Sequence, residues 1–175
     1  EPAPMDSDAF FDHCRGFISD ALLEQLQGLD PVPGDGPVCC SVHSAWNQHE
    51  TDLRNWTVRI RSQRLRRDGE RFIRPEGDLS AAMELHVTEA LDQKSPVETE
   101  RRLDEMRWFF LDHLSVGHDF DFEALVIYCL KLAILDKWAH DNRDTGRERL
   151  YGAVDALGQP MHPGSQEESK PENQQ

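Results

Sequence analysis

Residues 124–135 read ALVIYCLKLAIL, and this stretch decides the fold class. All of its residues except Lys131 are apolar or aromatic. A helix that is apolar all round belongs in a protein core, and the stretch is shorter than the roughly 20 residues needed to cross a membrane. It therefore predicts a central buried helix.

The sequence on the N-terminal side of this stretch has the spacing of further helices. From Trp46 to Ile60, apolar residues recur three and four positions apart, which places them on one face of a helix. Residues 95–98, SPVE, are a helix-start signal with a Ser cap, Pro in the first turn and a Glu that closes a capping box. No run alternates apolar and polar residues between turn signals, as a half-buried strand would. The sequence predicts an all-α fold, a compact bundle of five to six helices.

Gly and Pro residues divide the chain into segments. We predict an N-terminal helix over 6–29, a Pro- and Gly-rich loop over 30–44 and a main helical unit over 45–157. Together they form one helical domain, 1–157. Residues 158–175 show no hydrophobic periodicity, and their composition cannot bury enough apolar surface to offset the entropy of ordering. We predict that they form a disordered tail.

The charge of the chain is unevenly distributed. The formal net charge is −14, which argues against general nucleic-acid binding, where a domain pI above about 9 is usual. Yet eight of the fifteen arginines lie between Arg54 and Arg74. They form either a solvated helix face, where each exposed ion pair contributes about 0–1 kcal/mol, or a surface for an acidic partner. The use of arginine rather than lysine favours bidentate recognition of carboxylates. The candidate partner-binding residues are Arg54, Arg59, Arg61, Arg64, Arg66 and Arg67.

No motif of an active site is present. The sequence has no G-x-S-x-G turn, no phosphate loop and no Glu-x-x-His pair. One possible zinc set comprises Cys39, Cys40, His43 and His49, but structural zinc sites usually use two spaced ligand pairs, and no second pair completes this one. We therefore predict no catalytic residue, no metal site and no cofactor. Two alternatives stay open, a metal-binding helical enzyme and an RNA-binding helical module that uses the arginines from Arg54 to Arg74.

Three stretches carry a family resemblance: ETDLRNWTVRIRSQRL (50–65), RRLDEMRWFFLDHL (101–114) and FDFEALVIYCLKLAILDKWAHDNRDTGRERL (120–150). They resemble a helical family of unknown function that is encoded with bacterial V-type ATP synthase subunits. In that family an acidic residue and LRN open one helix, and a Y-x-L-K-L-x-I-L-x-x-W pattern closes the domain. The matching family-pattern residues are Asp52, Asn55, Tyr128, Lys131 and Trp138.

The first stretch also has distant similarity to the stalk-seating component of V-type ATPases that is known as the C, or d, subunit. Its Asp-x-x-Asn-x-x-x-x-x-Arg signature is matched by Asp52, Asn55 and Arg61. That component is an all-helical funnel that seats the central stalk on the membrane rotor ring. It is considerably longer than this chain and contains several related helical units, which favours an accessory role here over a complete socket.

The resemblance implies a non-enzymatic accessory or stalk-type subunit that takes part in ion transport through protein–protein contact. Its partners would be V-type ATPase subunits. The protein would be cytoplasmic at the inner face of the membrane, attached to the membrane through its partners only and bound to no nucleic acid. Four cysteines in 175 residues agree with a reducing compartment, because they are too few for a disulfide scaffold.

Overall fold

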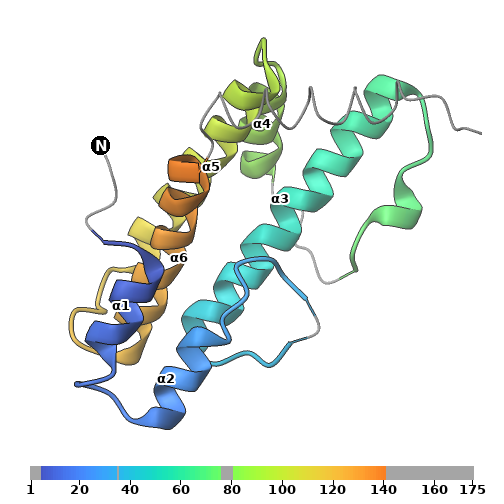
Figure 1. Ribbon diagram of the computed structural model, residues 1–175. Helices are drawn as coiled ribbons and strands as arrows, with labels where there is room; N and C mark the ends of the chain where they lie inside the picture. Colours follow the sequence, from blue (N-terminus) through green and yellow to red (C-terminus); the bar gives the residue numbers. More distant parts are fainter. Residues whose placement is uncertain (1–4, 35, 76–80, 141–175) are drawn as a thin grey trace, which may run out of the picture. The chain divides into compact units, whose positions relative to one another are not determined.

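A computed structural model describes residues 5–34, 36–75 and 81–140 (Figure 1). Within these ranges the chain is helical and contains no strand, which confirms the predicted all-α fold. The elements are α1 (Ser7–Cys14), α2 (Asp20–Gln27), α3 (Ser41–Leu65), the 3-10 helix η1 (Glu70–Phe72), α4 (Ala81–Leu91), α5 (Pro96–Leu114) and α6 (Phe122–His140).

The prediction of one N-terminal helix over 6–29 is wrong, because this segment forms two helices, α1 and α2. Gly16 lies in the turn between them. Ser19 restarts the helix, since its Oγ accepts a backbone N–H of the next turn at 3.4 Å. Apolar periodicity did not reveal the break, because Phe10 before it and Leu23 after it are both buried in the same cluster.

The third helix begins earlier than predicted. The predicted loop over 30–44 includes the first turn of α3, which starts at Ser41. Val42 is 3% exposed and lies one turn before Trp46, so it extends the buried stripe of the helix. The stripe itself is confirmed, since its members are all buried: Trp46, His49, Leu53, Trp56 and Ile60.

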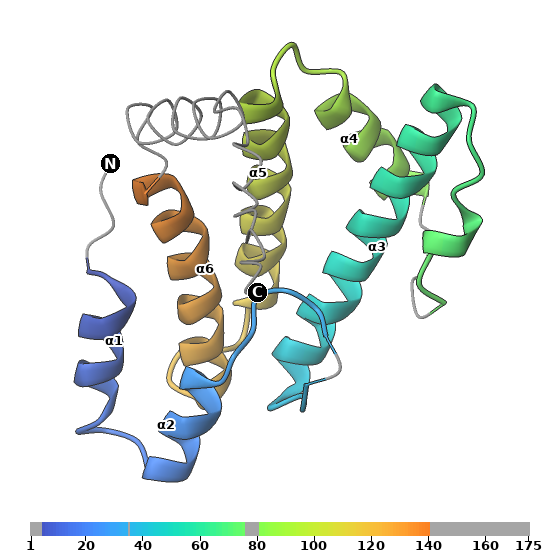
Figure 2. The ribbon, with the colours of Figure 1, turned by 45° about the vertical axis from the view of Figure 1, so that its right-hand side comes forward.

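Two apolar clusters hold the helices together. The first joins α1, α2, α3, α5 and α6, and the predicted central helix supplies much of it: Val126, Ile127, Leu130, Leu132 and Ile134. Figure 2 shows α6 between α1 and α5. The second cluster joins the other part of α3 to α4 and α5: Leu53, Trp56, Ile60, Val87, Ala90 and Leu103. α3 and α5 contribute to both clusters and so connect them.

Within the described ranges, no helix is both long and apolar enough to cross a membrane. The predicted domain end at 157 and the predicted disordered tail over 158–175 lie outside the residues that the structure describes, so both stay predictions.

Candidate interaction surface

Two of the candidate arginines face their own chain. The Nη1 atom of Arg54 donates to the Phe72 carbonyl at 2.8 Å, which ties α3 to the last residue of η1. The guanidinium of Arg59 lies 5.8 Å from the ring centre of Trp56 and 4.0 Å from a carboxylate oxygen of Glu70. These contacts give both arginines a structural role within the chain.

Arg64 is held by the turn between α4 and α5. Its Nη1 donates to the Leu91 carbonyl at 2.9 Å, and its Nη2 contacts Asp92 Oδ1 at 2.5 Å. The backbone carbonyl and the carboxylate together fix the position of the guanidinium. This arginine therefore joins the end of α3 to the end of α4.

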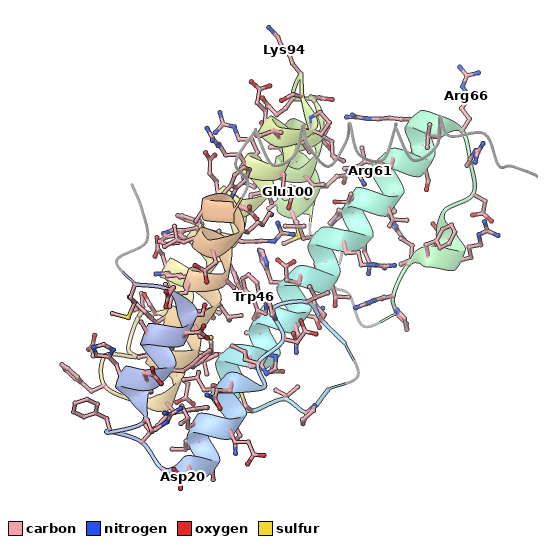
Figure 3. All side chains as sticks on the ribbon, in the orientation of Figure 1. Asp20, Trp46, Arg61, Arg66, Lys94 and Glu100 are labelled. Atoms are coloured by element: carbon pink, nitrogen blue, oxygen red, sulfur yellow. The ribbon has the colours of Figure 1, made fainter. Side chains whose placement is uncertain are left out.

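The remaining candidates, Arg61, Arg66 and Arg67, are exposed and make no side-chain hydrogen bond or ion pair with a described residue. Arg66 caps the C-terminus of α3 with a φ of 50°, in the left-handed region. Figure 3 shows its side chain pointing outward, and Lys94 pointing outward from the α4–α5 turn at the same end of the described helices. Three of the six candidate arginines therefore have no side-chain partner among the described residues, and Lys94 lies near this end of α3.

A notch of about 350 Å³ lies where the end of α3 meets the α4–α5 turn and the start of α5. We call it the basic notch. Its walls carry three cationic side chains, two hydroxyls, an amide and one carboxylate, together with two apolar side chains: Arg61, Arg64, Leu91, Gln93, Lys94, Ser95, Pro96, Thr99 and Glu100. Lys94 was not a candidate from the sequence, because an isolated lysine in a turn gives no signal until the fold brings it beside α3.

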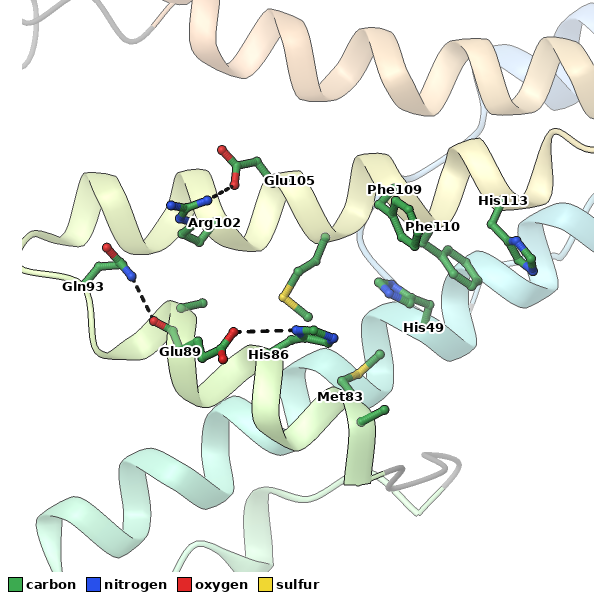
Figure 4. A pocket seen from close by; sticks show the side chains of 13 residues that line it. His49, Met83, His86, Glu89, Gln93, Arg102, Glu105, Phe109, Phe110 and His113 are labelled. Carbon is green, nitrogen blue, oxygen red and sulfur yellow. Dashed lines mark hydrogen bonds and ion pairs between the residues drawn. The ribbon is translucent and has the colours of Figure 1, made fainter.

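A second, larger hollow of about 940 Å³ lies among α3, α4 and α5 (Figure 4). Its middle is apolar, and it includes Phe109, which is 76% exposed. His49 lines it from α3, with its ring stacked on Phe110 at 4.0 Å and 15°. Charged groups near the ends are paired on their own helices, as Arg102 is with Glu105 at 2.7 Å. This groove is therefore a mainly apolar surface, unlike the basic notch.

A network of charged side chains links α3, α5 and α6. The buried Asp104 accepts from Arg107 Nη1 at 2.7 Å, Lys137 Nζ at 2.8 Å and Trp138 Nε1 at 2.7 Å. Arg107 also reaches across to Glu50 on α3 at 2.9 Å. Sequence reasoning missed this network, since its members are spread over α3, α5 and α6 and follow no local motif.

The network changes the acidity of its members. Burial raises the pKa of Glu50, but the adjacent His49 ring and the Arg107 guanidinium outweigh it and hold the pKa below its ordinary value. Burial lowers the pKa of Arg107, but Glu50 and Asp104 raise it further than burial lowers it. Both groups are therefore charged near neutral pH.

The family-pattern residues of α3 support the fold. Asn55 is fully buried and pairs with the backbone of Arg74, donating from Nδ2 to its carbonyl at 2.8 Å and accepting its N–H at 2.9 Å. Asp52 is buried too and accepts from Gln48 Nε2 at 3.2 Å. Asp52 and Asn55, three positions apart on α3, thus help to hold α3 and to connect it to the chain around Arg74.

The family-pattern residues of α6 contact neighbouring helices. Tyr128 lies against Phe10 of α1, with ring centres 4.9 Å apart. Lys131 leaves the apolar helix along its stem and pairs with the half-exposed Asp112 at 2.6 Å. Trp138 Nε1 donates to the buried carboxylate of Asp104 on α5. These residues lie on the helix that the resemblance emphasised, and each has a structural contact.

The possible zinc ligands do not form one set. Cys39 Sγ lies 3.4 Å from His43 Nδ1 and 3.9 Å from Cys40 Sγ, while His49 lines the apolar groove. Burial and the neighbouring Cys40 raise the pKa of Cys39 to about 11, so its thiol is mostly protonated at neutral pH. Cys39, Cys40 and His43 thus lie together at the start of α3, whereas His49 lies apart from them in the groove.

Among the described residues, one trio has potential ligand atoms within 4.8 Å of one another: His118, Asp121 and Glu123. Asp121 caps α6, because its Oδ1 accepts the Ala124 N–H at 2.9 Å while its Oδ2 lies 2.7 Å from His118 Nδ1. The hydrogen bond raises the pKa of His118 and lowers that of Asp121. Helix capping accounts for this arrangement.

Two comparisons with known proteins found nothing similar: no curated protein and no solved structure matches the chain. The third, against protein families, found a match over residues 78–160, slightly less than half of the chain. The matched part includes α4, α5 and α6, and so the α4–α5 turn and the network carboxylate. Over these residues the chain is similar to the family described as Protein of unknown function (DUF2764).

Proposed function

We propose that this protein is a non-enzymatic accessory or stalk-type subunit of a bacterial V-type ATPase or ATP synthase, and that it acts through protein–protein contact. The observation that carries the proposal is the exposed cationic end of α3, where Arg61, Arg66 and Arg67 have no partner among the described residues. A chain of net charge −14 has abundant carboxylates, so arginines that pair with none of those in the described ranges are suited to contact with an acidic partner.

The identity of the partner rests on the sequence resemblance over residues 50–150. The family match over 78–160 overlaps this range, and its description names no function. Under the proposal the protein is cytoplasmic at the inner face of the membrane and peripheral to it through its partners. Asn55, Lys131 and Trp138 make contacts within the chain, which supports a scaffold role for the family pattern. Under the proposal, the arginines provide the contact surface.

Affinity purification of the tagged full chain from its native cells tests the proposal. V-type ATPase subunits, identified by mass spectrometry, should accompany the wild-type protein and dissociate as salt rises. The variant Arg61→Gln/Arg66→Gln/Arg67→Gln should keep its helical content and retain less of these subunits. A matched control, Arg15→Gln/Arg101→Gln/Arg102→Gln, removes three exposed charges elsewhere and should retain them.

Two results would contradict the proposal. One is that the wild-type protein brings down none of the ATPase subunits at low salt. The other is that it brings down RNA that is lost in the triple variant, which would favour the nucleic-acid alternative.

A further inference from the structure

The basic notch offers more hydrogen-bond donors than its own acceptors can use. Arg61 and Lys94 line it and make no hydrogen bond or ion pair with a described residue. The hydroxyls of Ser95 and Thr99 lie in the same lining. Such a set of cationic and hydroxyl groups is suited to an anion.

The one carboxylate of the notch is already engaged. Glu100 Oε1 contacts Lys137 Nζ at 2.5 Å and Arg107 Nη1 at 3.2 Å, so two cations of the charge network compete for it. It is therefore poorly placed to neutralise Arg61 and Lys94 as well. Counting only the described residues, Arg61 and Lys94 leave the notch with a surplus of positive charge even though the chain is acidic.

One wall of the notch is fixed before any partner arrives. Arg64 is held by the Leu91 carbonyl at 2.9 Å and by Asp92 at 2.5 Å, as described above. A guanidinium whose position is fixed loses little conformational entropy on binding. Arg61 on the same helix and Lys94 are then the cations of the notch that have no partner among the described residues.

We infer that the basic notch binds a glutamate or aspartate side chain presented by an acidic segment of a partner protein. The partner's identity as an ATPase subunit rests on the proposed function, but the notch's preference for a carboxylate does not. Arg61 and Lys94 contact the carboxylate, and the neighbouring Arg66 and Arg67 attract further acidic groups of the same segment.

Charge favours a short acidic protein segment over a nucleic acid. Double-stranded DNA carries one negative charge per about 1.7 Å of axis, and a long polyanion would meet the acidic remainder of this chain. A protein segment brings a few carboxylates to one place. At physiological salt, repulsion beyond about 8 Å is largely screened, so the local positive surplus determines the contact.

A direct test uses the full-length purified protein and a fluorescein-labelled helical peptide of alanine and glutamate, with glutamates at i and i+4. Fluorescence anisotropy should show binding that weakens as salt rises. The same peptide with glutamine in place of glutamate should not bind. Circular dichroism checks that each variant keeps its helical content.

The variant Arg61→Gln/Lys94→Gln should bind the acidic peptide about five- to tenfold more weakly. A second variant, Thr99→Glu, places a competing carboxylate in the notch and should weaken binding without removing a cation. The control Arg15→Gln/Arg101→Gln makes the same change in net charge outside the notch and should leave binding within about twofold of wild type.

Three outcomes would overturn the inference: no binding of the acidic peptide, equal loss in the control and notch variants, or tighter binding of a single-stranded RNA that is lost in the notch variant. The proposed function can fail separately. If ATPase subunits co-purify with the wild-type protein but the acidic peptide does not bind, the carboxylate site in the notch is excluded and the proposed function stands. If the peptide binds in the notch but no ATPase subunit co-purifies with the wild-type protein, the carboxylate site stands and the proposed function is excluded.

Discussion

Asn55 shows how one side chain connects distant segments of this protein. It lies fully buried on α3 and bonds to both backbone groups of Arg74, nineteen residues later in the chain. The same residue belongs to the family pattern read from the sequence. The pattern could be recognised there, but the role could not, because the position of Arg74 depends on the path of the chain after η1.

We expect Asn55→Ala to lower the free energy of unfolding by about 2 kcal/mol, since two backbone groups of Arg74 lose their partner at a partly buried position. Urea unfolding measures this. Gln63→Ala, at an exposed position of the same helix, is the control and should change the stability by less than about 0.5 kcal/mol. Equal stabilities for both variants would mean that water replaces the Asn55 side chain without cost.

At the scale of elements, α5 contributes to both apolar clusters of the described structure. Its start could be predicted from the sequence, but its contacts could not. The start of α5 was predicted correctly, because Ser95 caps it with a bond from the Glu98 N–H to its Oγ at 3.2 Å, a local signal. The partners of Asp104 were not predicted, because they lie on α6 and on the same face of α5, and only packing brings them together. The break between α1 and α2 was missed because the local apolar pattern continues through both helices.

We expect Asp104→Asn to lower the free energy of unfolding by about 3 kcal/mol, because it leaves Arg107 and Lys137 short of a buried negative partner. The matched control is Asp112→Asn, which removes a half-exposed carboxylate paired with Lys131 and should cost about 1 kcal/mol or less. Chemical denaturation of both variants provides the measurement. A similar small cost at both positions would show that the network is as solvated as a surface pair.

The contact between α3 and α5 also predicts an acid response. The folded-state pKa of Glu50 is held below its ordinary value of 4.5, so its contribution to stability is present above pH 4.5 and is lost as pH falls through the folded-state pKa. In Glu50→Gln, the fall in unfolding free energy below pH 4.5 should be shallower than in wild type. Parallel slopes for Glu50→Gln and wild type in urea unfolding across about pH 3 to 6 would exclude this role.

For the described molecule as a whole, two apolar clusters of unequal size predict unequal local stability. α6 buries five apolar residues in the larger cluster, whereas the 11-residue α4 buries Val87 and Ala90 in the smaller one. Elements with few buried apolar contacts open at lower free energy. In native-state hydrogen exchange, backbone amides of α4 should therefore exchange before those of the middle of α6. Simultaneous exchange of both helices would indicate one cooperative unit.

At Arg66, the left-handed backbone conformation lowers the stability of the fold, whereas the side chain is proposed to bind an acidic partner. A non-glycine residue in that conformation costs about 1 kcal/mol, and glycine would relieve it. Arg66→Gly should thus raise the midpoint of thermal unfolding while weakening capture of an acidic partner, and a lower midpoint would show that the arginine stabilises the end of α3. Selection for a more robust fold alone would drive this position toward glycine, so a library sorted for thermal stability and one sorted for partner binding should diverge at residue 66.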